Sequence, residues 1–167
     1  TKHAVGYLAK HQKIDPERCL IRGGSAGGYT VLSALTFTDT FKAGASLYGI
    51  GDLETLATDT HKFESRYLDS LIGPYPKHRD VYLERSPIHH AESLNCPVIF
   101  LQGLEDKVVP PNQAEMMVKL LEDKGIQVAY VAFPDEGHGF RKADNIIRAM
   151  ESELAFYRDV FNLVGDV

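Results

Sequence analysis

The 167-residue sequence has no tryptophan, only two cysteines and no strongly basic stretch. The formal net charge is −5, which disfavours binding to nucleic acid or to an anionic membrane surface. No apolar run approaches the roughly 18 residues that cross a bilayer. No secretory signal is visible at the start of the chain, so we expect a cytoplasmic protein, with the presence of a targeting segment upstream of Thr1 left open.

The two cysteines and the histidine pair do not favour a metal site. Cys19 and Cys96 each stand at the edge of an apolar, strand-like run, where cysteine usually behaves as a small hydrophobe, and we predict buried thiols. His89 and His90 are neighbours whose side chains diverge, and no Cys or acidic partner has a fitting spacing. The sequence therefore predicts no metal and no other cofactor.

Hydrophobic residues make up 44% of the chain, enough for one sizeable core in a single domain over residues 1–167. Apolar strand-like runs alternate with helical patterns, and this alternation predicts an α/β fold with a parallel sheet. Residues 53–90 are more polar and less regular, with a break at 73–76. We predict strands at 19–23, 43–48, 97–103 and 128–133, and helices at 3–11, 26–37, 63–71, 112–125 and 145–163.

Four glycines surround one serine directly after the first predicted strand, in the stretch GGSAGG at residues 23–28. This stretch fits the Gly-x-Ser-x-Gly nucleophile elbow, a sharp turn that holds the serine hydroxyl clear of the backbone at the start of a helix. The alternative is a glycine turn required only by packing. Because ligands bind beyond the carboxyl ends of parallel strands, Ser25 is the candidate nucleophile.

A serine hydroxyl needs a base within hydrogen-bond reach and a third group that orients this base. His138 is the candidate base, because it follows the last predicted strand and lies between two glycines. None of the other six histidines directly follows a core strand.

Three carboxylates compete for the orienting role. Asp106 lies just beyond the third predicted strand, and the chain order Ser, Asp, His is that of the α/β-hydrolases. Its neighbour Glu105 is interpreted as a solvated loop charge. Asp52 follows the second strand at a comparable place and is the reserve candidate.

The segments "GGSAGGY", "LQGLEDKVVPPNQAEMMVKLL" and "FPDEGHGF" together resemble the catalytic domain of the prolyl oligopeptidase family of serine peptidases, most nearly its acylaminoacyl-peptidase and dipeptidyl-peptidase-like members. The resemblance runs from about Asp15 to the end. It implies the C-terminal portion of an α/β-hydrolase fold. It also implies Ser25 as nucleophile, Asp106 as acid and His138 as base.

The resemblance implies further roles and a substrate class. The backbone N–H of Ala26 would donate to the oxyanion, Val109 would help to line the pocket for the residue before the scissile bond, and short peptides would be the substrates. The family also has earlier strands, a second oxyanion donor and a β-propeller, none of which is recognisable in this sequence. We therefore expect the C-terminal part of a catalytic domain, with little activity alone and with an open strand edge that favours a homo-oligomer.

Two alternatives stay open. The chain could be an esterase or dienelactone-type hydrolase of the same fold, or a catalytically inactive fragment that keeps the motifs by descent. The sequence also leaves open whether acylated residues, dipeptides or internal bonds are cleaved.

Overall fold

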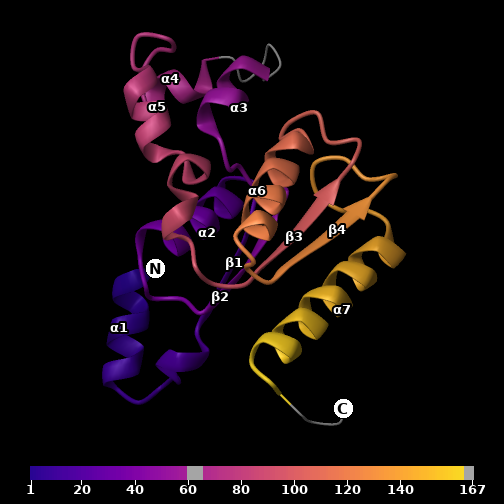
Figure 1. Ribbon diagram of the computed structural model, residues 1–167. Helices are drawn as coiled ribbons and strands as arrows, with labels where there is room; N and C mark the ends of the chain where they lie inside the picture. The colour runs from indigo at the N-terminus through magenta and orange to yellow at the C-terminus, as the bar shows by residue number, and fades with distance from the viewer. Residues whose placement is uncertain (60–65, 164–167) are drawn as a thin grey trace.

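The computed structural model describes residues 1–59 and 66–163. Four parallel strands form one sheet in the order β1-β2-β3-β4 (Figure 1). Their bounds are β1 Leu20–Gly24, β2 Ala43–Leu47, β3 Val98–Gly103 and β4 Val128–Phe133. The predicted α/β class is confirmed, and each predicted strand is present to within one residue at either end.

Helices connect the strands. The long helices α2 (Ala26–Phe37), α6 (Asn112–Asp123) and α7 (Ala143–Val160) follow β1, β3 and β4, and α1 (Lys2–Lys10) and the 3₁₀ turn η1 (Pro16–Arg18) precede β1. The sequence predicts a helix at each of these places except η1. The glycine that follows α6, Gly125, has a φ of 71° and its N–H donates to Glu122 O, as expected for a C-terminal cap.

The less regular region between β2 and β3 forms several short helices. They are α3 (Leu53–Asp59), α4 (Tyr67–Leu71), α5 (Arg79–Arg85) and the 3₁₀ segment η2 (Pro87–Ser93). The helix predicted over 63–71 is present as α4, and residues 63–65 lie outside the described residues. The sequence did not predict α3 and α5, because helical periodicity is detected over windows of 11–18 residues and these helices have seven residues each.

Two apolar clusters hold the layers together. α2 and α6 cover one face of the sheet, and among the described long helices α7 covers the other face (Figure 1). The first cluster includes Val31, Leu32 and Met117, and the second includes Ile99, Phe133 and Phe156. Every residue of β3 is buried, which explains its continuous apolar sequence.

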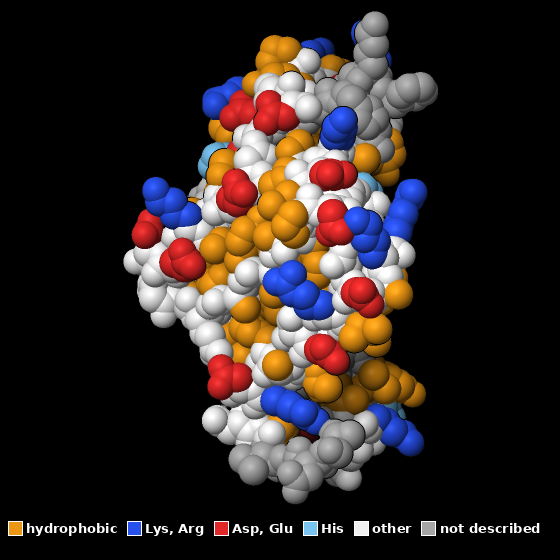
Figure 2. Space-filling view, turned by 90° about the vertical axis from the view of Figure 1, so that its right-hand side faces the viewer, with side chains coloured by type: hydrophobic (Ala, Val, Ile, Leu, Met, Phe, Trp, Pro, Cys, Tyr) orange, Lys and Arg blue, Asp and Glu red, His pale blue; other side chains and the backbone are white. Residues whose placement is uncertain are grey.

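One edge of the sheet and one face of α7 are less covered. Among the described strands, β1 pairs only with β2. Ile146, Ile147, Met150 and Leu154 on α7 are each at least 40% exposed, and Figure 2 shows hydrophobic side chains along this side of the molecule. The homo-oligomer expected from the open strand edge stays a prediction.

Candidate active site

The turn between β1 and α2 holds Ser25 in a strained conformation. Ser25 has φ 57° and ψ −121°, and its N–H donates to Leu47 O over 2.9 Å. A Cβ on Gly23 would lie 2.5 Å from the carbonyl oxygen of Gly27, whereas a Cβ on Gly27 would meet nothing within 4 Å. The first glycine of the motif is therefore required by the close approach of the backbone in this turn, and the second glycine is not required by contact.

The loop after β4 brings His138 to Ser25. Gly137 and Gly139 form an antiparallel bridge, so that His138 stands at the tip of a narrow loop. The His138 Nε2 lies 2.9 Å from Ser25 Oγ. The ring of Tyr48, which the sequence did not single out, packs edge-on against the imidazole with ring centroids 5.0 Å apart.

The loop after β3 brings Asp106 to the other side of the imidazole. Its Oδ2 lies 2.8 Å from His138 Nδ1, and its Oδ1 accepts hydrogen bonds from the N–H groups of Val108 and Val109, each over 2.9 Å. The Asp106 side chain is fully buried. An ionised carboxylate only accepts hydrogen bonds, so this geometry assigns the proton of the neutral imidazole to Nδ1 and leaves Nε2 to accept the Ser25 hydroxyl proton.

The two competing carboxylates are engaged elsewhere. Asp52 is buried, but its Oδ1 accepts the N–H of Glu54 over 2.9 Å and its Oδ2 accepts the Thr55 hydroxyl over 2.6 Å. It therefore stabilises the start of α3. Glu105 is exposed to solvent, as expected of a loop charge. The structure brings together Ser25, His138 and Asp106.

A cavity of about 340 Å³ opens beside Ser25 and His138. Ala26 also lines it, and as the first residue of α2 its N–H has no acceptor within the helix. Val109, which is 2% exposed, also lines the cavity, and its role toward the residue before the scissile bond stays a prediction. The other apolar lining residues are Ile50, Leu56, Tyr67, Leu68 and Val108. Sequence reasoning missed Leu56, Tyr67 and Leu68, because they come from the short helices between β2 and β3.

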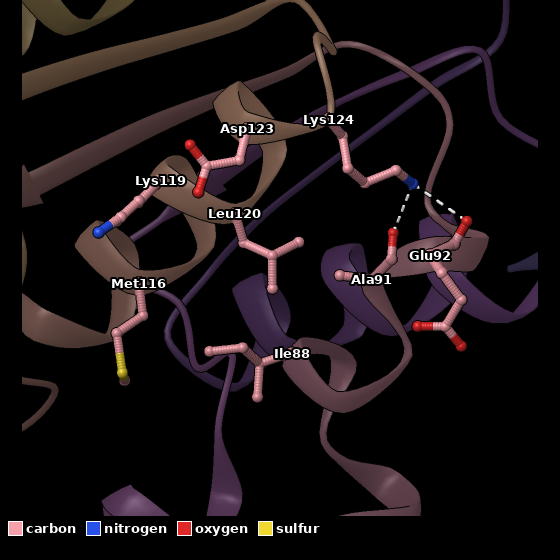
Figure 3. A pocket seen from close by; sticks show the side chains of 8 residues that line it. All are labelled: Ile88, Ala91, Glu92, Met116, Lys119, Leu120, Asp123 and Lys124. Carbon is pink, nitrogen blue, oxygen red and sulfur yellow. Dashed lines mark hydrogen bonds between the residues drawn. The ribbon is translucent and has the colours of Figure 1, made fainter.

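A second hollow, of about 600 Å³, lies between α6 and η2 (Figure 3). Its floor includes Ile88 and Leu120, and no Ser, Cys or His side chain lines it. At one end, Lys124 Nζ donates to the carbonyl oxygens of Ala91, Glu92 and Leu94 and so fixes η2 against α6. The second hollow therefore lacks the Ser, Cys or His side chains of a triad-type site.

No group of three or more His, Cys, Asp or Glu side chains in residues 1–59 and 66–163 is arranged to hold a metal ion. His89 lies 4.0 Å from Asp52, whereas His90 packs against Phe37, so the two rings diverge. Cys19 and Cys96 are free thiols, and both are half-buried, which corrects the prediction that they are buried. Burial still raises the pKa of the Cys96 thiol to about 11. Over the same residues, no helix is long and apolar enough to cross a membrane.

Comparisons with known proteins identify relatives of this chain and their family. A profile of the "Prolyl oligopeptidase family" matches residues 2–164. Dipeptidyl aminopeptidase BIII of Pseudoxanthomonas mexicana is 34% identical over 148 residues, which cover 85% of this chain and 22% of that protein. A puromycin-hydrolysing peptidase of Mycobacterium tuberculosis superposes with a TM-score of 0.91 at 52% identity, over 94% of this chain and 24% of that chain.

An acylaminoacyl peptidase of Pyrococcus horikoshii has a TM-score of 0.84 at 28% identity, over 92% of this chain and 25% of that chain. The chain thus spans about a fifth to a quarter of the length of these relatives.

Proposed function

This chain belongs to the prolyl oligopeptidase family, and from that premise we propose that it carries the catalytic triad of a serine peptidase that acts on short peptides. The observation that carries the proposal is the chain of two hydrogen bonds, 2.9 Å from Ser25 to His138 and 2.8 Å from His138 to Asp106. Both lengths lie within the range required for proton transfer between a nucleophile and its base.

The geometry supports one reaction sequence. Ser25 Oγ attacks the carbonyl carbon of the scissile bond while its proton passes to His138 Nε2. When the tetrahedral intermediate collapses, the C–N bond breaks and His138 gives that proton to the leaving amine. Water then attacks the acyl-enzyme, His138 again takes a proton, and Ser25 is regenerated as the carboxylic acid leaves. Asp106 fixes the tautomer and stabilises the imidazolium that forms in both steps.

The N–H of Ala26 donates to the oxyanion. The first N–H groups of a helix have no partner within the helix, and the helix dipole favours negative charge at this end. Ala26 is the only oxyanion donor that we identify in the described part of the chain. Because removal of one such donor typically costs about 10²–10³ in kcat, we expect slow turnover by the 167-residue chain.

The lining of the cavity favours substrates with an apolar residue before the scissile bond. Val108 and Val109 line one side of it, and Leu56, Tyr67 and Leu68 line it from the helices after β2. No charged side chain lines this cavity in the described residues. A charged substrate side chain would therefore lose its hydration without gaining a partner.

The test is the hydrolysis of peptide p-nitroanilides. Aminoacyl, dipeptidyl and acylaminoacyl anilides, each with an apolar residue before the anilide, are incubated with the chain and with its Ser25→Ala variant. We expect slow release of p-nitroaniline. The Ser25→Ala variant should lose this release, and the control variant Ser33→Ala, two turns later in α2, should keep it. Equal release by Ser25→Ala would overturn the proposal. Cleavage of p-nitrophenyl esters without any anilide cleavage would favour the esterase alternative.

A further inference from the structure

The loop that carries His138 is closed at its base by one side chain. Glu136 precedes Gly137 at the entry of the loop and is only 3% exposed. Its Oε2 accepts the N–H of Arg141 over 3.0 Å, and its Oε1 accepts the N–H of Lys142 over 2.9 Å. Both donors come after His138 in the chain, so this carboxylate joins the exit of the loop to its entry.

The backbone of Glu136 also contacts the loop that carries Asp106. Its carbonyl oxygen accepts the N–H of Glu105 over 2.9 Å. A Cβ on Gly103 would lie 2.4 Å from the same oxygen, so the end of β3 lies very close to the backbone of Glu136. One residue therefore contacts both of the loops that meet at the imidazole.

The charge of Glu136 suits this place. The N–H of Lys142 is the main cause that holds the pKa of the Glu136 carboxyl below its usual value, and the carboxyl is therefore ionised at neutral pH. Asn145 Nδ2 adds a third hydrogen bond of 3.0 Å to Oε1. These donors lie at the start of α7, where a negative charge is favoured. Glu136 takes no part in the reaction sequence proposed above.

Resting on the proposed function, we propose that Glu136 is a positioning residue whose carboxylate fixes the loop 137–140 so that His138 Nε2 stays within reach of Ser25 Oγ. The loop needs such a tie, because His138 is flanked by two glycines and Gly139 has a φ of 88°. Without the carboxylate, the narrow loop would be free to move at its exit. A misplacement of about 1 Å can cost on the order of 10²-fold in rate.

The test compares Glu136→Gln with Asp135→Asn. A glutamine has one acceptor oxygen, and its NH₂ group would face a backbone N–H donor, so one loop hydrogen bond is lost. Asp135→Asn is a matched control, because it removes the same charge one residue earlier in the chain. The exposed carboxylate of Asp135 accepts hydrogen bonds from the side chains of Lys142 and Asn145. The measurements are the second-order rate of reaction with a fluorophosphonate and the low-field proton resonance of His138 Nδ1–H.

We expect Glu136→Gln to lower the fluorophosphonate rate about 10- to 100-fold and to broaden or shift the His138 resonance, while Asp135→Asn changes neither. A wild-type rate and resonance in folded Glu136→Gln would overturn the inference. If Glu136→Gln does not fold, the same rate and resonance are measured on Glu136→Asp, which keeps the charge on a shorter side chain. Wild-type values in that variant would also overturn the inference. If the wild-type chain itself does not react, the proposed function fails, and the resonance still tests the role of Glu136.

Discussion

The loops after β2 and β3 contain the same local turn, but the aspartate in each loop has different partners. Each has a buried aspartate whose Oδ1 accepts backbone N–H groups two and three residues later, at Asp52 and at Asp106. The difference lies in the other oxygen, which faces the Thr55 hydroxyl in the first loop and His138 in the second. The two aspartates therefore share the same local turn. Their roles differ because the fold places a different group next to Oδ2, so that Asp52 caps a helix and Asp106 is the candidate catalytic acid.

Each loop is also anchored by a buried glutamine. Gln113 Oε1 accepts the N–H groups of Gly51 and Asp52, each over 2.9 Å, and ties the loop after β2 to α6. Gln102 Nε2 donates to Val109 O over 3.2 Å and ties the loop after β3 to its own strand. Val109 N–H in turn bonds Asp106, so only the second anchor leads to the candidate site.

The largest effect expected from this comparison is that of Asp106→Asn. The imidazole would lose the partner that fixes its tautomer and stabilises its charge, and a loss of about 10⁴-fold in rate is the precedent for such a change. Asp52→Asn keeps an acceptor for the start of α3 and should change the rate little. The fluorophosphonate rate of the folded variants measures both. If the two effects are reversed, Asp52 after β2 is the catalytic acid, and the roles assigned to the two aspartates are wrong.

A smaller effect separates the two anchors. Gln102→Met and Gln113→Met each leave buried backbone groups unpaired and should lower the free energy of unfolding by about 1–3 kcal/mol. Only Gln102→Met should also lower the fluorophosphonate rate of the folded protein, because only Gln102 holds the loop of Asp106. Urea unfolding and the labelling rate are measured on the same samples. An equal loss of rate in the two variants would mean that the loops are not functionally distinct.

The smallest effect concerns substrate preference, where the two loops act together. Ile50 from the loop after β2 and Val109 from the loop after β3 both line the cavity. Either residue, enlarged to Phe, should shift the preference toward smaller residues before the scissile bond by about 1–3 kcal/mol. The relative kcat/KM across alanyl, leucyl and phenylalanyl anilides measures this shift. Unchanged ratios in Val109→Phe would remove Val109 from the substrate site.

The sequence predicted the four strands and the long helices because their apolar runs are continuous or regularly spaced. It also singled out Ser25, Asp106 and His138, since each follows a strand of a parallel sheet and such strand ends meet at one edge. It could not separate Asp52 from Asp106 by spacing alone, because both follow a strand and both begin the same turn.

Two parts of the site were beyond the sequence. Leu56 lies on α3, a helix of seven residues that is too short to leave a periodic pattern. Tyr67 and Leu68 lie on the predicted helix α4, but their place at the cavity depends on how the region between β2 and β3 folds. Glu136 belongs to the segment FPDEGHGF, but the sequence indicates no role for it, because its hydrogen bonds from Arg141 and Lys142 depend on how the loop folds back. The cytoplasmic location and the self-association stay predictions.

The measurement that tests the central claim most directly is the position of the covalent adduct after fluorophosphonate treatment. The chain and its His138→Ala variant are labelled, digested and analysed by mass spectrometry. We expect a single adduct, on Ser25, in the wild-type chain. In His138→Ala the rate of adduct formation should fall by several orders of magnitude. An adduct on another residue, or an adduct on Ser25 that forms equally fast without His138, would contradict this prediction.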